Sequence, residues 1–144
     1  MKTSSIPKGF NTVTPYLAVH RARQTIDFLK AAFAAHEIET HQLPDGRIMN
    51  AIVKIGDSMV FIGERPAEAK AWPGMLYMYV EDVDSTFRKA VDAGGKVIAE
   101  PADQFYGERS GAIEDPSGNQ WWIAMHIEDL SNEELLSRAE KRGK

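Results

Sequence analysis

The chain repeats itself, and this repeat limits its possible folds more than any other feature of the sequence. The segment TPYLAVHRARQTIDFL, which begins at Thr14, matches MLYMYVEDVDSTFRKA, which begins at Met75, in its order of a strand pattern followed by a helix pattern. At the same offset of 61 residues, NAIVK from Asn50 matches GAIED. After one inserted residue, GDSMVFI matches GNQWWIA. Because self-similarity at a fixed period indicates one structural unit used again, we expect two similar modules.

Each module is expected to contain one strand, one helix and three further strands. The first helix shows an apolar face, because Ala22, Ile26, Leu29 and Phe33 recur at helical spacing. The turns IGDS and DPSGN predict hairpin connections by their Gly, Asp, Asn and Pro content. Strands are expected near residues 12–19, 37–42, 48–55 and 58–63, and then near 75–80, 96–100, 110–114 and 120–126. The sequence therefore predicts an α+β fold built from two β-α-β-β-β modules.

With 144 residues, the chain is expected to form a single domain, 1–144. Its parts are predicted as module 1 at about 10–64, a linker at 65–74, module 2 at about 75–128 and a C-terminal helix at 131–142. That helix opens with a capping box of Ser131 and Glu134. Because it is mostly polar, we expect it to lie on the surface or across a partner subunit.

Composition excludes several classes of function. A formal net charge of −4 argues against nucleic-acid binding, which favours basic patches. No run of about eighteen apolar residues is present, so no membrane span is predicted. The absence of cysteine excludes disulfides, thiolate metal sites and a cysteine nucleophile. The first residues also lack the continuous apolar segment of a secretory signal. We therefore expect a soluble, cytoplasmic protein.

The paired modules, the stretch VEDVDSTFRKAVDAGG (Val80–Gly95) and the DPSGN turn before the last strand resemble the vicinal-oxygen-chelate superfamily. This superfamily includes glyoxalase I, extradiol dioxygenases, fosfomycin-resistance transferases and bleomycin-resistance proteins. The segments TPYLAV, DGRIMNA and IGDSMVFI are similar to its PhnB-like branch. The resemblance covers roughly residues 10–128. It implies that the sheets curl into a cup, with two modules paired within one chain or across a homodimer.

The resemblance also implies where a metal would be bound. Members with metal chemistry carry His, Gln or Glu on the first and the final strand of each module. The matching positions here are Thr14, Val60, Met75 and Trp122. A hydroxyl, a hydrocarbon, a thioether and an indole are not usual ligands of a divalent metal. Many PhnB-like sequences also carry His where Asn50 stands. We therefore expect neither a metal nor another cofactor.

The adjacent Trp121 and Trp122 must point to opposite faces of one strand. Because Trp122 holds an inherited ligand position, we expect it to face the cup and Trp121 to face the helices. Strand alternation and a loop at the rim then predict the ligand-binding residues. They are Thr14, Tyr16, Asn50, Val60, Met75, Tyr77, Tyr79, Phe105, Tyr106, Arg109, Trp122 and His126. This aromatic, sparingly polar set is typical of a small-molecule pocket.

Two alternatives to this interpretation stay open. The rings can instead fill the cup as ordinary core, and Arg109 can pair with Glu108 or Glu114 on the surface. No catalytic group emerges from the rest of the sequence. The HEIETH segment spaces its histidines by five residues, whereas the zinc-protease signature needs four. His126, at a strand end, has a further hypothetical role as a general base.

Three hypotheses about function follow. The leading one is a metal-free, homodimeric protein that binds a small flat or aromatic molecule in its cup, as bleomycin-resistance proteins sequester a drug. The second is a metal-dependent lyase, isomerase or dioxygenase with a rearranged ligand set such as Asn50, His126 and Glu64. The third is an interaction module whose cup is filled.

Overall fold

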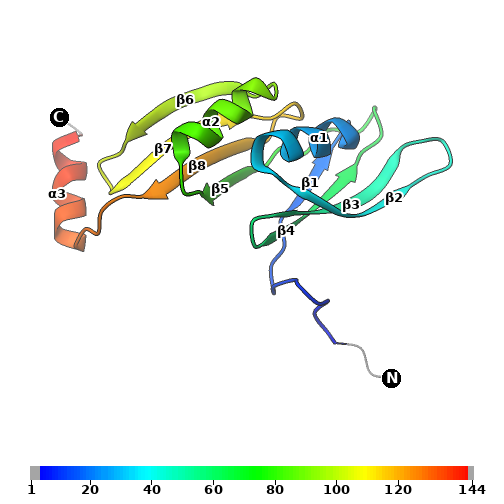
Figure 1. The fold of residues 1–144 in the computed structure, drawn as a ribbon, viewed down its shortest axis with the longest axis horizontal. Coiled ribbons are helices and arrows are strands. Elements are labelled where there is room, and N and C mark those ends of the chain that lie inside the picture. Colours follow the sequence, from blue (N-terminus) through cyan, green and yellow to red (C-terminus); the bar gives the residue numbers. More distant parts are fainter. Residues whose placement is uncertain (1–3, 143–144) are drawn as a thin grey trace.

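The computed structural model describes residues 4–142 and shows two modules of the predicted kind (Figure 1). The first comprises β1 (Tyr16–Val19), α1 (Ala22–Phe33), β2 (His36–Gln42), β3 (Ile48–Ile55) and β4 (Ser58–Glu64). The second comprises β5 (Met75–Tyr79), α2 (Val83–Asp92), β6 (Lys96–Asp103), β7 (Glu108–Glu114) and β8 (Gln120–His126). A last helix, α3 (Asn132–Arg142), follows. The predicted α+β fold with a C-terminal helix is confirmed.

Each module forms its own four-stranded mixed sheet, in the orders β1-β4-β3-β2 and β5-β8-β7-β6. In each sheet the first strand pairs in parallel with the last, and the other pairs are antiparallel. The register places Tyr16 opposite Phe61 and Tyr77 opposite Trp122. The offset of 61 residues therefore relates the first strands and also the last strands of the two modules. The counterpart of Trp122 is Phe61, so our matching of the last strands, which paired Trp122 with Val60, was wrong by one residue.

Helices α1 and α2 lie side by side and cover the same side of the two sheets (Figure 1). A carboxylate fixes the first turn of each helix, where backbone N–H groups lack helical partners. Asp82 accepts a hydrogen bond from the Ser85 backbone N–H at 3.1 Å, so it caps α2. Glu64, at the end of β4, accepts one from the Ala22 backbone N–H at 3.0 Å, at the start of α1. The last residue of the first sheet thus orients the helix that covers it.

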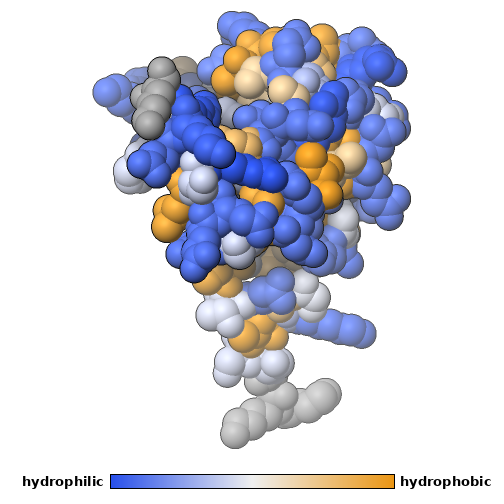
Figure 2. Space-filling model, turned by 90° about the vertical axis from the view of Figure 1, so that its left-hand side faces the viewer, coloured by the Kyte–Doolittle hydropathy of each residue, from blue (hydrophilic) through white to orange (hydrophobic). Residues whose placement is uncertain are grey.

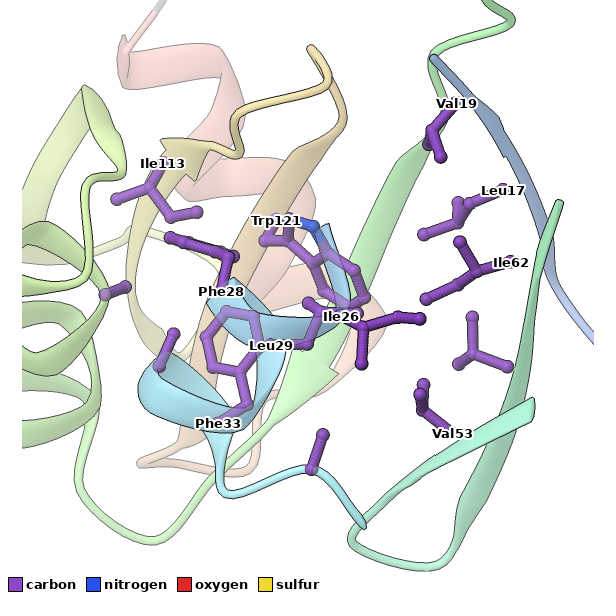
Figure 3. Packing of buried hydrophobic residues seen from close by; sticks show 14 of the residues in the cluster. Leu17, Val19, Ile26, Phe28, Leu29, Phe33, Val53, Ile62, Ile113 and Trp121 are labelled. Carbon is purple, nitrogen blue, oxygen red and sulfur yellow. The ribbon is translucent and has the colours of Figure 1, made fainter. Parts of the chain in front are cut away.

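The hydrophobic core lies between this helix pair and the sheets (Figure 3). Leu17 and Ile62 enter it from the first sheet, and Ile113 enters it from the second. Phe33 of α1 packs on Trp121 of β8 with ring centroids 5.2 Å apart. Because side chains from both modules belong to one buried cluster, the two halves share a single core.

The first strand starts at Tyr16, four residues later than the sequence pattern predicts. Val13, which lies within the predicted strand, is exposed and outside the observed one. Proline explains the difference, because Pro15 has no N–H to donate and restricts the backbone of the residue before it. The segment before β1 leaves the ladder, and its Phe10 stacks on Phe61 with ring centroids 5.6 Å apart. The N-terminal segment therefore lies against the first sheet without being a strand of it.

Helix α3 lies at the outer end of the second sheet, and none of its residues is buried (Figure 1). The Ser131 hydroxyl accepts a hydrogen bond from the Glu134 backbone N–H at 3.1 Å, as the capping motif predicts. Arg138 attaches the helix to Glu128 and to the Phe105 carbonyl oxygen. Figure 2 looks onto this end and shows a largely hydrophilic surface. Within residues 4–142, no helix combines the length and the apolar character needed to cross a membrane.

Candidate functional site

The side of each sheet that is turned away from α1 and α2 is called the cup face below. Trp121 and Trp122 define it in the second sheet. Trp121 is 2% exposed and packs in the core on the helix side, where its Nε1–H donates to Asp115 Oδ2 at 3.0 Å. Because side chains alternate along a strand, the half-buried Trp122 points to the cup face, as the sequence predicts.

The same alternation places Met75, Tyr77 and Tyr79 of β5 on the cup face of the second sheet. All three side chains are exposed, whereas Leu76 and Met78 between them pack against the core. Large exposed apolar and aromatic side chains gathered on one face mark a binding surface more often than an ordinary surface. These three predicted residues therefore lie together beside Trp122, since Tyr77 is its register partner.

On the first sheet, the cup face carries Tyr16 and Phe61, whose ring centroids are 5.8 Å apart. Thr14 lies half-buried just before β1. Asn50 is half-buried on β3, and its side-chain oxygen lies 2.7 Å from His41 Nδ1. Tyr16 and Asn50 thus belong to the same sheet face but to a different sheet from Trp122.

Val60 does not lie on the cup face, so this part of the prediction is wrong. Its side chain is 3% exposed and belongs to the core on the helix side. A shift of one residue in a strand moves every side chain to the opposite face, and our matching of the last strands of the two modules contained such a shift. Phe61, the next residue, occupies the predicted place.

The side chain of Arg109 does not point to the cup rim, where we predicted that it would bind a ligand. Its guanidinium donates two hydrogen bonds of 2.8 Å to Asp84 of α2 and one of 3.1 Å to Asp103. These carboxylates raise the pKa of Arg109. Because Asp84 lies on a helix, Arg109 points to the helix side. Its partners are also not the Glu108 or Glu114 of our alternative interpretation.

The rim loop between β6 and β7 carries Phe105 and Tyr106, both half-buried, with ring centroids 5.2 Å apart. Phe105 is held by α3, since Arg142 stacks over its ring at 5.1 Å. Tyr106 adds to the raised pKa of Tyr77, whose main causes are burial and the hydrogen bond to Glu108.

The sequence interpretation missed Glu108, which organises the cup face of the second sheet. Both Tyr77 and Tyr79 donate their hydroxyl hydrogen bonds to its carboxylate, the latter at 2.6 Å. His126, its register partner on β8, lies 3.8 Å away through Nδ1. Ala124, the register partner of both Tyr79 and Ser110, has only a small side chain beside this contact. The structure thus joins three predicted residues around one unpredicted acid.

The charges in this group are set by their mutual contacts. Burial raises the pKa of Glu108, but the hydrogen bonds from Tyr77 and Tyr79 outweigh burial, so the pKa is lowered. Burial and the bond to Glu108 raise the pKa of Tyr77, and the bond to Glu108 raises that of Tyr79. Asp129, which lies 2.7 Å from His126 Nε2, raises the pKa of that imidazole, and Glu108 adds to the effect. Glu108 is therefore an anion flanked by two neutral phenols at neutral pH.

The positions that the resemblance associates with a metal do not offer the donors that a divalent metal prefers. The positions that the resemblance associates with a metal hold Thr14, Phe61, Met75 and Trp122, once the register is corrected. Among residues 4–142, no three His, Cys, Asp or Glu side chains gather as metal ligands. Imidazole and carboxylate are the usual donors, so these residue types do not fit the metal site of metal-dependent relatives.

The rearranged ligand set of our second hypothesis is not assembled in this chain. Glu64 caps α1 on the helix side. Asn50 contacts His41 on the first sheet, and His126 lies at the end of the second sheet beside Asp129. These three side chains therefore belong to three separate neighbourhoods.

Two hollows flank the sheets. One of about 570 Å³ lies between the modules and is lined by Val60 and Trp121 from the core side and by Tyr77 and Tyr79 of β5. A larger one of about 800 Å³ surrounds the start of α1 and is lined mainly by charged and polar residues. Both volumes are typical of small-molecule sites, and the smaller hollow is the one that adjoins the cup-face tyrosines.

Comparison with known proteins agrees with this architecture. The family model described as Glyoxalase/Bleomycin resistance protein/Dioxygenase superfamily matches residues 9–123. An uncharacterized protein of Mycobacterium bovis is 28% identical, over 91% of this chain and 93% of its own length. The crystal structure of TioX from Micromonospora sp. ML1 superposes with a TM-score of 0.69 at 21% identity, covering 81% of this chain and 99% of TioX.

A PhnB protein from Bacillus cereus has a TM-score of 0.61 at 12% identity, covering 80% of this chain and 99% of that protein. At such identities the structural likenesses show a shared fold, while the family model covers most of the chain. The chain therefore belongs to the Glyoxalase/Bleomycin resistance protein/Dioxygenase superfamily.

Proposed function

We propose that this protein binds a small, flat or aromatic molecule on its cup faces and does so without a metal. The observation that carries the proposal is a pair of aromatic register partners at equivalent places in the two sheets. Tyr16 lies opposite Phe61 in the first sheet, as Tyr77 lies opposite Trp122 in the second. Ring faces supply large apolar contact area to a flat ligand, and the tyrosine hydroxyls orient it.

The metal-free part of the proposal is supported by the side chains at the positions where related proteins hold a metal. Phe61, Met75 and Trp122 offer hydrocarbon, thioether and indole. Binding without turnover is the mechanism of the bleomycin-resistance type named in the family description, and it requires no metal ligand. The PhnB-like branch is proposed on the segments TPYLAV, DGRIMNA and IGDSMVFI and on the fold of the Bacillus cereus protein.

A ligand screen by thermal shift, run with and without divalent metals, tests the proposal. An aromatic ligand at about one hundred times its Kd is expected to stabilise the protein by about 2.7 kcal/mol. For a chain of this size, that corresponds to an increase in Tm of roughly 5–10 °C. We expect the increase to survive a chelator and to disappear in Trp122→Ala, whereas Leu136→Ala, which changes an exposed residue of α3, is the control that retains it.

Two results of this screen contradict the proposal in different ways. A stoichiometric divalent metal that survives dialysis, together with binding lost on chelation, would show the metal-dependent alternative. A complete lack of stabilisation by any compound, with a stable protein partner recovered in pull-downs, would show the interaction module.

We further propose that a second copy of the chain completes the cup. The two sheets of one chain lie side by side and do not face each other (Figure 1). Their cup faces leave Tyr16 58% and Tyr79 63% exposed. Exposed patches of this kind are typical of interfaces, and twofold dimers are the commonest closed assembly.

Light scattering on the purified protein tests the dimer. We expect a mass of twice the chain's 16.1 kDa, retained on dilution to micromolar concentration. The physical reason is that a twofold partner removes the exposed aromatic rings of the cup faces from water. A monomer at every concentration would contradict the proposal without affecting the assignment of the ligand-binding face.

A further inference from the structure

Glu108 is an anion that is largely removed from solvent but lacks a strong permanent counter-ion. Its side chain is 12% exposed, and its lowered pKa keeps it ionised. Among the described residues its ion-pair partner is His126, at 3.8 Å, and that imidazole makes its shorter contact, 2.7 Å, with Asp129. The neighbouring Arg109 points to the helix side. A carboxylate has about four acceptor positions, so two remain beyond the two tyrosine bonds.

Aromatic rings surround this carboxylate. The rings of Tyr77 and Tyr79 lie 5.6 Å apart between centroids and are tilted by 66°, so the two present differently oriented surfaces. Both phenols donate their hydroxyl hydrogen bonds to the Glu108 carboxylate. The faces of such rings are electron-rich and attract cations. Ring faces together with a partly desolvated carboxylate form an environment that favours a positively charged group.

A buried hydroxyl lies beside Glu108 on the same face of β7. Ser110 is two residues further along that strand, is 1% exposed, and has Ala124 as its register partner. Its Oγ has no hydrogen-bond partner within residues 4–142. Buried polar atoms are rarely left unpaired, and an unpaired one is costly. A ligand that reaches between the tyrosines and β7 would supply the missing partner.

We infer that Glu108, framed by Tyr77 and Tyr79, recognises a protonated amine on a ring-bearing ligand. The amine donates to the Glu108 carboxylate and lies against the tyrosine faces, and the apolar body of the ligand lies towards Trp122. The inference names the ligand class of the proposed binding function and therefore rests on that function. It differs from that function by predicting charge selectivity, which ring stacking alone does not produce.

Three probes with the same ring and different charge test this selectivity. They are phenethylamine, a cation, 2-phenylethanol, which is neutral, and phenylacetate, an anion. Binding to the protein is measured by chemical-shift titration at mildly alkaline pH. A smaller fraction of His126 is protonated there, so this imidazole competes less with the amine for Glu108. We expect phenethylamine to bind about tenfold more tightly than 2-phenylethanol, and phenylacetate to bind more weakly than both.

Two variants connect this preference with the carboxylate and with the rings. Glu108→Gln keeps the shape of the side chain and removes its charge, so the preference for phenethylamine over 2-phenylethanol is expected to vanish. Tyr79→Leu removes an exposed ring and keeps the charge of Glu108. This variant is expected to weaken the binding of phenethylamine more than the binding of 2-phenylethanol. Glu114→Gln removes a carboxylate from the far end of the same row of β7 and serves as the matched control. The control is expected to retain the preference.

Each result decides the matter. Equal affinities for all three probes, or an unchanged preference in Glu108→Gln, would overturn the inference and leave the proposed binding of flat molecules standing. Failure of all three probes to bind would overturn both. If Glu108→Gln does not fold, Tyr79→Leu decides, because an unchanged amine preference in that variant contradicts a role for the rings.

Discussion

Trp121→Ala is expected to lower the free energy of unfolding by about 3–5 kcal/mol, the usual cost of emptying a buried tryptophan site. The ring is in contact with Phe33 of α1, so its loss leaves a cavity in the core that the two modules share. Its Nε1–H also donates a hydrogen bond to the buried Asp115, and this bond is lost when the indole is removed. Urea denaturation followed by circular dichroism measures the change.

Trp122→Ala is the matched control, because it removes the same side chain one residue further along the same strand. Trp122 lies on the half-buried cup face, so we expect it to cost no more than about 1.5 kcal/mol. Trp121→Phe keeps an aromatic ring and removes the hydrogen bond. Its loss in the free energy of unfolding is expected to lie between those of the two alanine variants. Similar losses for both alanine variants would show that the two faces of β8 are wrongly assigned.

The opposite directions of these two tryptophans are an example of what can be predicted from the sequence. The internal repeat and the alternation within QWWIAMH predict both the fold and the opposite directions of Trp121 and Trp122. These features are local, because they follow from the period of a strand and from the order of elements. Tyr77 and Tyr79 were placed on the cup face for the same reason.

The errors arise where the prediction needed a register or an element boundary. A shift of one residue in matching the last strands of the two modules was sufficient to assign Val60 to the cup face, because the period of a strand is two. Glu108 was missed because the strand was expected to begin at residue 110, whereas β7 begins two residues earlier. Extending the alternation of Ser110 and Ala112 backwards would have placed Glu108 on their face.

Other features of the candidate site depend on contacts that are distant in sequence. The hydrogen bonds of Tyr77 and Tyr79 to Glu108 span about thirty residues, and they form because β8 brings β5 and β7 together. Arg109 was assigned to the rim because its strand neighbour Asp103 and its helix neighbour Asp84 are close only in the folded chain. Such partners are chosen by sheet order and not by spacing along the chain.

The DPSGN turn, which contributed to the family resemblance, has a structural role in this protein. Asp115 is buried and accepts hydrogen bonds from the backbone N–H groups of Ser117 and Asn119 at 2.9 and 3.0 Å. It also accepts from the Asn119 side chain and from Trp121 Nε1. The Asn119 side-chain oxygen accepts in turn from the Gly74 backbone N–H at 2.8 Å, just before β5. One carboxylate thus fixes the start of β8 and, through Asn119, the entry to β5.

Asp115→Ala is therefore expected to destabilise the protein by about 3–5 kcal/mol, because several buried donors lose their acceptor together. The orientation of β8 follows from the same contacts, so we also expect Trp122 fluorescence and ligand binding on the cup face to change. Asp115→Asn keeps one acceptor oxygen, so its free energy of unfolding is expected to decrease less than that of Asp115→Ala. Urea denaturation and the thermal-shift response to an aromatic ligand measure the two effects.

Asp45→Ala separates this effect from the loss of a turn aspartate in general. Asp45 accepts a hydrogen bond from the Arg47 backbone N–H at 3.0 Å in another turn, but there the carboxylate is exposed to water. Water replaces the lost acceptor at that site, so we expect the free energy of unfolding to decrease by less than about 1 kcal/mol. Comparable losses for Asp45→Ala and Asp115→Ala would mean that burial of the donors is not the cause. A large loss of stability confined to Asp115→Ala would show that the buried turn aspartate stabilises the core beneath the proposed binding face.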